Sequence, residues 1–226
     1  MSVVAVSKVA FATEVNDMAE YQLIPSKTAL VNVDMQNAFV EGTPLSAPDG
    51  VALLPVVNRL AAACRDAGMM VIHTLHVTRA NGSNHGTMGE LIEPVRAGYI
   101  NEGTETAKLH PGVHVGPRDI MLYKPRYGSF TGTDLDLILR SNGIDTIIVT
   151  GICTNICCET TAREAGMKDY HVFFPSDGTE TFPTGGLTVE EIKKATLATL
   201  GTAFAKITTV DETIDLIRRN SNGVAT

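Results

Sequence analysis

The chain has 226 residues, 44% of them hydrophobic, which is enough for one large α/β domain with a substantial core. Its 18 basic and 25 acidic residues give a formal net charge of -7, and no cluster of Lys or Arg argues for nucleic acid or a membrane as partner. No signal peptide and no apolar segment of roughly 20 residues is evident. Four cysteines, three of them crowded together, do not resemble a secreted disulfide framework. We expect a soluble, cytoplasmic protein with reduced thiols.

Strand and helix patterns alternate along the chain. Apolar runs rich in β-branched residues predict six strands, at 28–34, 69–77, 119–124, 145–151, 170–175 and 206–210. Helical spacing of apolar residues predicts helices at 51–68, 133–143, 157–165, 188–204 and 211–219. The alternation favours a three-layer α/β/α sandwich with a mostly parallel, six-stranded, Rossmann-like sheet. We divide the chain into a leader segment, 1–27, and one domain, 28–226.

The segment 78–118 interrupts this pattern. It is rich in Gly, Asn and His and shows little periodicity. A connection of that length is more often a lid, a substrate loop or an oligomer contact than an idle linker. We therefore expect a lid or an interface between subunits here.

Reactive side chains follow three of the predicted strands. Asp34 ends the first strand, Lys124 ends the third, and a cysteine cluster follows the fourth. Ligands of open α/β sheets bind outside the carboxyl ends of the strands. We therefore expect these groups to meet at one edge of the sheet.

The cysteine cluster, Cys153, Cys157 and Cys158, fits neither a zinc site nor a thioredoxin-type pair. Thr154 or Asn155 suits the N-cap of the following helix, which would put Cys157 in its first turn. Free N–H groups and the helix dipole there would lower the pKa of the thiol and could hold an oxyanion. The alternative is that all three thiols are small buried hydrophobes.

Asp34 and Lys124 favour the nucleophile. An isolated aspartate, with a pKa of about 3.9, is a poor base for a thiol with a pKa of about 8.5. The difference between the two pKa values makes the proton transfer unfavourable by roughly 6 kcal/mol. A neighbouring Lys124 would narrow it by stabilising the thiolate. Carboxylate, ammonium and thiol could then relay one proton without a histidine. Taken singly, Asp34 could be a strand-end cap and Lys124 a solvated side chain.

Three segments, ALVNVDMQNAF, LYKPRYGSFTGTDLDLILRSNGI and VTGICTNICCETTAREA, resemble motifs of the isochorismatase-like cysteine hydrolase superfamily. The resemblance covers about 28–218. It implies a catalytic triad of Asp34, Lys124 and Cys157. It also implies a cis peptide before Cys153 and an oxyanion hole formed by the backbone N–H groups of Cys153 and Cys157.

The resemblance also separates branches of the superfamily. Members that cleave the vinyl ether of isochorismate lack the cysteine, so amide hydrolysis is favoured here. Nicotinamidases carry a metal-binding Asp-x-His, whereas this chain has Thr78 at the position of the His. His73, His76 and His85 could be proposed as ligands, but without the carboxylate we expect no metal and no cofactor.

The segments KPRYGSF and ILRSNGI resemble the ureidoacrylate and biuret hydrolase branches. Arg126 could hold a substrate carboxylate, and an ion pair elsewhere is its alternative. Further candidates for substrate contacts are Phe39, Tyr127, Phe130 and Asn155, for which core packing or, for Asn155, helix capping is the alternative.

We therefore expect a cysteine-dependent amidohydrolase that cleaves a C–N bond of a small linear amide, ureido or carbamoyl compound through a thioester. The alternatives are a nicotinamidase or maleamate-type amidase, a thiol redox sensor, and a binding protein without turnover. The resemblance implies a homodimer or homotetramer.

Overall fold

A computed structural model of the chain describes residues 21–221. The predicted leader therefore lies mostly outside the described residues. Seven parallel strands form one sheet in the order β3-β2-β1-β4-β5-β7, with β6 pairing with the end of β4. Their bounds are β1 (Thr28–Val33), β2 (Met70–His76), β3 (Ile120–Lys124), β4 (Thr146–Ile152), β5 (His171–Pro175), β6 (Thr179–Glu180) and β7 (Lys206–Thr208).

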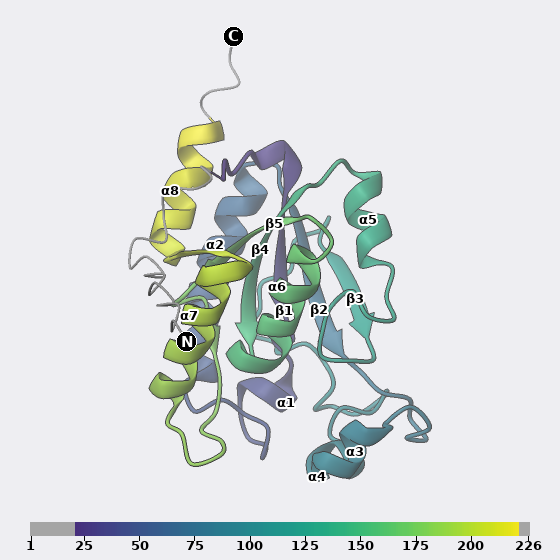
Figure 1. Cartoon of the computed structure of the whole chain (residues 1–226). Coiled ribbons are helices and arrows are strands. Elements are labelled where there is room, and N and C mark those ends of the chain that lie inside the picture. The colour runs from purple at the N-terminus through teal and green to yellow at the C-terminus, as the bar shows by residue number, and fades with distance from the viewer. Residues whose placement is uncertain (1–20, 222–226) are drawn as a thin grey trace, which may run out of the picture.

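Helices cover both faces of this sheet, which confirms the predicted three-layer architecture (Figure 1). They are α1 (Asn37–Val40), α2 (Gly50–Asp66), α3 (Thr87–Leu91), α4 (Glu93–Arg96), α5 (Leu135–Ser141), α6 (Glu159–Gly166), α7 (Val189–Ala203) and α8 (Val210–Ser221), with a 3₁₀ turn η1 (Pro25–Lys27) and a π-helical turn η2 (Thr154–Cys158). Helices α2 and α8 pack on one face, and α5, α6 and α7 on the other. In residues 21–221 no helix is long and apolar enough to cross a membrane.

The central strand β1 shows why the sheet is buried on both sides. All six of its residues are buried. Ala29, Val31 and Val33 face the α5–α6–α7 layer, whereas Leu30 faces the α2–α8 layer. Continuous apolar strands of this kind need helices on both faces, which βαβ crossovers supply. The one strand that the pattern did not predict, β6, has only two residues and is too short to show any periodicity.

The sheet reverses its direction of growth between β1 and β4. From β1 the chain proceeds to β2 and β3 on one side, and from β4 to β5 and β7 on the other. Gly151 makes the close approach of these two strands possible. Its φ is 118°, and a Cβ added there would lie 2.0 Å from the carbonyl oxygen of Val33. Ligands of open α/β sheets bind at such a reversal, beyond the carboxyl ends of the strands.

The segment 78–118 contains α3 and α4 and is fixed to the loop after β1. The Gln36 side chain donates to the carbonyl of Ala107 at 2.7 Å, and the His110 N–H donates to the carbonyl of Met35 at 2.9 Å. The second half of the segment is thus an anchored wall beside the carboxyl edge of the sheet. A lid or subunit interface formed by 78–118 remains a prediction.

A series of hydrogen bonds among buried polar side chains runs across neighbouring strands on the face of the sheet that α2 covers. Asn32 Nδ2 lies 3.2 Å from His73 Nδ1, and His73 Nε2 lies 2.9 Å from Asp119 Oδ2, which also accepts from Arg65 Nη2 at 2.7 Å. Burial lowers the pKa of His73; hydrogen bonding to Asp119 acts in the opposite direction and Arg65 in the same direction. The folded protein therefore holds this histidine neutral.

We expect the free energy of unfolding to fall as the pH drops below about 6.5. Below that pH His73 becomes protonated in the unfolded chain but stays neutral in the folded protein. Above that pH both states are neutral at this site, so the contribution is complete. The slope can reach about 1.4 kcal/mol per pH unit for one proton. Urea titrations from neutral to mildly acidic pH would measure it, and His73→Gln should reduce the slope. An unchanged slope in the variant would contradict this assignment.

Candidate active site

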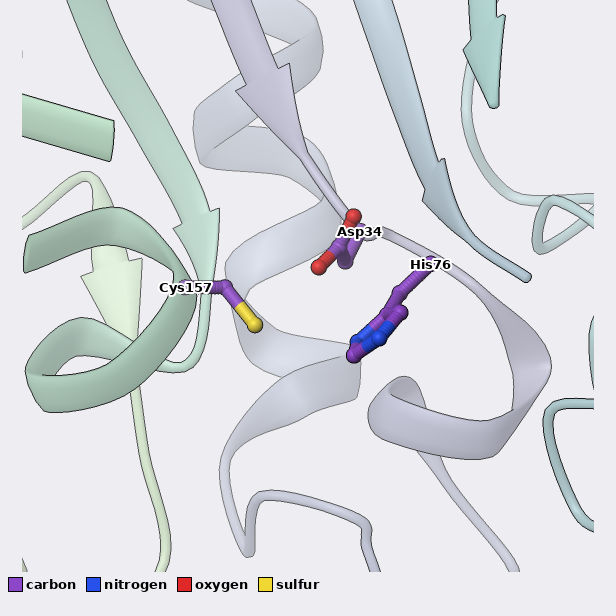
Figure 2. A group of neighbouring side chains, drawn as sticks. All are labelled: Asp34, His76 and Cys157. Atoms are coloured by element: carbon purple, nitrogen blue, oxygen red, sulfur yellow. The ribbon is translucent and has the colours of Figure 1, made fainter. Parts of the chain in front are cut away.

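Four neighbouring strands each deliver one buried side chain to the same point. In the order of the sheet, Lys124 ends β3, His76 ends β2, Asp34 follows β1, and Cys157 follows β4 in η2. Figure 2 shows the last three pointing toward one another. The exposed fractions of the four residues are 0%, 2%, 0% and 4%. The structure thus brings together the three residues predicted as a triad and adds a histidine.

Asp34 occupies a backbone conformation that few non-glycine residues adopt. Its φ is 52°, and its N–H donates to the carbonyl of Thr74 at 3.1 Å. The Thr74 hydroxyl donates to Asp34 Oδ1 at 2.7 Å. Residues held in this region of φ/ψ space persist when their surroundings fix them. The adjoining β2 strand therefore sets the direction of the carboxylate.

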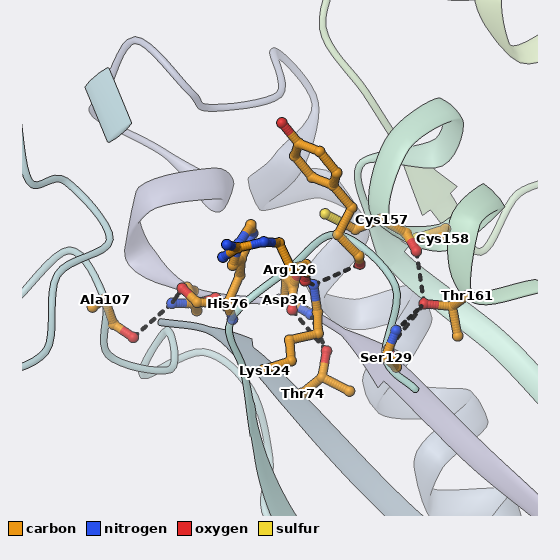
Figure 3. Close-up of polar contacts among 12 residues, drawn as sticks. Asp34, Thr74, His76, Ala107, Lys124, Arg126, Ser129, Cys157, Cys158 and Thr161 are labelled. Carbon is orange, nitrogen blue, oxygen red and sulfur yellow. Dashed lines mark hydrogen bonds and ion pairs between the residues drawn. The ribbon is translucent and has the colours of Figure 1, made fainter. Parts of the chain in front are cut away.

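Lys124 is the partner of this carboxylate. Its Nζ lies 2.7 Å from Asp34 Oδ2 and donates to the carbonyls of Arg126 at 2.9 Å and Tyr127 at 2.7 Å (Figure 3). Burial alone would lower the pKa of Lys124, but the negative charge of Asp34 and its hydrogen bond to the ammonium raise the pKa above its ordinary value. Within residues 21–221, Asp34 Oδ2 accepts no hydrogen bond of ordinary geometry, so the ion pair is its polar contact.

The backbone around Cys157 departs from α-helical geometry. The carbonyl of Cys153 accepts from the N–H of Cys158 at 3.0 Å, one residue beyond the α-helical partner. That register spares the Cys157 N–H from this bond, and the Cys153 N–H faces the Cys157 sulfur. The Ile152–Cys153 peptide is cis, as the resemblance implied. An oxyanion hole formed by the N–H groups of Cys153 and Cys157 stays a prediction.

The electrostatics of Cys157 correct one prediction. Burial raises the pKa of its thiol to about 12; Lys124 opposes this shift and Asp34 adds to it. This direction is opposite to the lowered pKa predicted for a thiol at a helix N-terminus, because burial has the largest effect and Asp34 offsets the positive charge of Lys124. The resting sulfur is a neutral thiol.

The other two cysteines are also buried but point elsewhere. Cys158 is fully buried, and its sulfur lies 3.8 Å from the carbonyl of Thr150, against the sheet. Cys153 belongs to an apolar cluster at the carboxyl edge of the sheet together with Ile152 and Phe39. Burial raises the pKa of both thiols well above the ordinary value. The neighbourhood of a carboxylate and an ammonium distinguishes Cys157 from both.

The predicted helix cap was wrong. The N-cap residue of η2 is Cys153, and no side chain caps the turn. Thr154 donates to the hydroxyl of Thr179 at 3.0 Å, and Asn155 Oδ1 accepts from the hydroxyl of Thr181 at 2.6 Å. Both side chains therefore fasten η2 to the segment around β6. The π register, which lengthens the turn, was not visible in the residue pattern.

His76 was considered as a metal ligand or as an ordinary strand histidine, and it forms a wall of the site. Its ring packs edge-on against Tyr127, with 5.8 Å between the ring centroids. Burial, together with the charge of Lys124, lowers the pKa of His76 well below its usual range, with a smaller contribution from Arg126. The ring is therefore neutral. The alternation of β2 gives the signal that could have found it, since His76 ends the strand next to β1.

The candidate substrate contacts divide into two groups. Arg126 lies beside His76 at the site (Figure 3). The ring of Tyr127 contacts the ring of His76. Arg126 Nη1 donates to the carbonyls of Asn84 at 2.9 Å and Pro125 at 2.6 Å, so its guanidinium is held in place. Phe130 instead packs against Tyr170, with 5.7 Å between the centroids.

Phe39 packs in the apolar cluster that contains Cys153, and Asn155 is hydrogen-bonded to Thr181. The structure thus shows packing for Phe39 and Phe130 and a hydrogen bond for Asn155, and their substrate contacts stay predictions. Tyr127 and Arg126 remain as candidates.

The nicotinamidase-type metal site does not fit these residues. Thr78 donates to Asn101 Oδ1 at 2.7 Å, and His85 Nε2 lies 2.8 Å from the same oxygen. His73 is bound to Asp119. Of the three histidines considered, only His76 faces the site, where its ring nitrogen, an Asp34 oxygen and the Cys157 sulfur lie within 4.8 Å of one another.

We expect iodoacetamide to modify Cys157 slowly near neutral pH, with a rate that still rises from about pH 8 to about pH 10, because the thiol is neutral in this range. Peptide mapping after short exposures at each pH would give the rate for each cysteine. Free cysteine, measured in parallel, should level off above about pH 8.5. A plateau for Cys157 below that value would show a preformed thiolate.

Comparisons with known proteins agree with this geometry. The chain matches the isochorismatase domain over residues 28–212. It is 34% identical to nicotinamidase 3 of Arabidopsis thaliana over 190 residues, 81% of this chain and 85% of that protein. It is 32% identical to a ureidoacrylate amidohydrolase of Enterobacter sp. (strain 638), and the match covers 85% of this chain and 90% of that protein.

Among solved structures, a cysteine hydrolase from Pseudomonas syringae pv. phaseolicola 1448A superimposes with a TM-score of 0.85 at 30% identity, covering 90% of this chain and 98% of that one. Both the domain match and the fold agree with the motifs around Asp34, Lys124 and Cys157. The chain belongs to the isochorismatase family.

Proposed function

We propose that the chain is a cysteine-dependent amidohydrolase that cleaves a C–N bond of a small linear ureido or carbamoyl compound. Relatives named nicotinamidase, N-carbamoylsarcosine amidase and ureidoacrylate amidohydrolase support hydrolysis of carbon–nitrogen bonds other than peptide bonds. The observation that carries the proposal is the buried Asp34–Lys124 ion pair beside the Cys157 thiol. A carboxylate, an ammonium and a thiol suffice for proton transfer and nucleophilic attack.

In the first step the Cys157 sulfur attacks the substrate carbonyl while its proton moves to Asp34. The two events occur together because a free thiolate is unfavourable in this site. Charge then develops on the substrate oxygen, where the N–H groups of Cys153 and Cys157 can stabilise it. Lys124 keeps the carboxylate oriented and compensates its charge.

In the second step the tetrahedral intermediate collapses to a thioester. The C–N bond breaks, and Asp34 returns the proton to the leaving nitrogen, so ammonia or an amine departs. Water then attacks the thioester with Asp34 as base, and the thiol of Cys157 is restored as the acid is released. No metal and no cofactor takes part in this sequence.

The preference for a ureido or carbamoyl substrate rests on the wall formed by three side chains. His76 offers a neutral ring, Tyr127 offers an aromatic face, and Arg126 offers the donors that Pro125 and Asn84 do not use. Such a group of donors suits a planar urea with a carboxylate at its far end. The ureidoacrylate amidohydrolases among the relatives support this class.

Nicotinamide is the second candidate, because a nicotinamidase is among the relatives. Thr78 in place of the metal-binding histidine weighs against it. A redox sensor is disfavoured because such a role has no use for the ion pair between Asp34 and Lys124. We also propose a homodimer or homotetramer with a contribution from 78–118.

Cys157→Ser should lose nearly all ammonia release from ureidoacrylate, biuret, maleamate, nicotinamide and N-carbamoyl amino acids, because a hydroxyl has no sufficiently strong base here. Cys158→Ala is the matched control one residue away, and it should keep most of the activity. Steady-state assays beside thermal melts would separate catalysis from folding. Full activity in Cys157→Ser, or loss confined to Cys158→Ala, would refute the proposed nucleophile.

Arg126→Gln should raise KM for substrates that carry a carboxylate by about 10-fold or more, with a smaller effect on kcat, because one charge-assisted contact is lost. A neutral substrate such as biuret serves as the internal control and should keep its KM. Equal effects on charged and neutral substrates would instead indicate that Arg126 only supports the backbone of Asn84 and Pro125.

A further inference from the structure

Three side chains at the carboxyl edge of the sheet present different ligand atoms to one point. A carboxylate oxygen of Asp34, a ring nitrogen of His76 and the sulfur of Cys157 lie within 4.8 Å of one another, and all three residues are buried (Figure 2). They come from β1, β2 and the turn after β4, so the pairing of the sheet holds them together.

The imidazole of His76 is the part of this group that the proposed reaction does not explain. The residue is 2% exposed, and within residues 21–221 its Nε2 has no hydrogen-bond partner. A buried polar atom without a partner is costly and calls for a ligand or a water. Asp34 Oδ2 differs, because the ammonium of Lys124 lies 2.7 Å from it. His76 Nε2 is therefore the atom that lacks a partner among the described residues.

We propose that Asp34, His76 and Cys157 form a binding site for a thiophilic divalent cation of the Zn²⁺ type. Sulfur, imidazole nitrogen and carboxylate oxygen are the ligands that zinc takes in proteins, and sites with three protein ligands leave a fourth position open. Zn–ligand distances of about 2.0–2.3 Å put tetrahedral ligand atoms about 3.5 Å apart. The ligand atoms, now within 4.8 Å of one another, would move closer together on binding.

The charges define what the fourth position accepts. Binding forms a Zn–S bond and releases the thiol proton of Cys157 to solvent, while His76 binds as the neutral ring. With Asp34 and the thiolate negative, Lys124 positive and the cation doubly positive, the site carries one net positive charge. An anion such as chloride or hydroxide is therefore the expected fourth ligand.

Occupancy would inhibit the enzyme. The cation would engage both the sulfur that attacks and the carboxylate that takes the proton, so neither could act. This consequence rests on the proposed function, whereas the existence of the site does not. The site also differs from a nicotinamidase-type centre, because it includes the nucleophile and not Thr78 or His85.

Cobalt(II) titration of the full-length protein tests the site without any substrate. The wild type should show a thiolate-to-cobalt absorption band and tetrahedral d–d bands at one equivalent. Cys157→Ser should lose the thiolate band, and His76→Asn should weaken binding at least about 10-fold. Cys64→Ala and His114→Ala are matched controls outside the site and should bind as the wild type does. Unchanged binding in His76→Asn and Cys157→Ser would overturn the proposal.

The wild-type protein supplies a test that needs no variant to fold. Zn²⁺ should protect Cys157 from iodoacetamide and should slow ammonia release, whereas Mg²⁺ should have neither effect. A chelator added after Zn²⁺ should restore both the modification of Cys157 and the rate of ammonia release. Modification of Cys157 at an undiminished rate with Zn²⁺ present would overturn the site. Protection without slower turnover of a confirmed substrate would overturn the inhibition. If no amide is hydrolysed, the proposed function fails, while the cobalt spectrum and the protection still decide the metal site.

Discussion

The ion pair between Lys124 and Asp34 is the interaction on which the rest of the site depends. Both side chains are fully buried, and their charged atoms are 2.7 Å apart. Either charge alone would cost several kcal/mol in this environment, so each residue requires the other. The carbonyls of Arg126 and Tyr127 satisfy the remaining donors of the ammonium. The loop after β3 is thereby fixed by the same contact that holds the carboxylate.

The mutual compensation of these charges shapes the chemistry around them. Burial raises the pKa of the Cys157 thiol, and Lys124, whose charge Asp34 compensates, does not reverse that shift. His76 is neutral for a related reason, since burial and the ammonium both disfavour its protonated form. A site with little net charge suits the uncharged amide group of the proposed reaction. In that proposal, charge develops only when the substrate is in place.

The sequence predicted the parts of this arrangement that follow from periodicity. Apolar strands ending in Asp34 and Lys124, and a thiol after β4, had to meet because parallel strands share one carboxyl edge. The protonation of Cys157 was not predictable in this way, since it depends on the balance of two charges and burial that only coordinates show. The π register of η2 was missed because it changes one hydrogen bond without any signature residue.

His76 illustrates a different limit. The pattern of β2 identified it as a strand residue, but its neighbours Tyr127 and Cys157 come from distant parts of the chain. Its importance therefore appears only once the strand order is known. The two residues of β6 and the bonds of Thr154 and Asn155 to Thr179 and Thr181 are likewise products of tertiary contact.

Each of four adjacent strands contributes one side chain to the site. The site therefore forms only when these strands pair in the correct register. On β3, Lys124 is fully buried while its neighbour Tyr123 is 64% exposed, because successive residues face opposite sides. A slip of β3 by a single residue would turn the ammonium outward and leave the carboxylate of Asp34 buried without its counterion. The ion pair therefore penalises mispaired sheets far more than a hydrophobic pair would. The contact between Lys124 Nζ and Asp34 Oδ2 thus favours correct strand pairing and also belongs to the candidate active site.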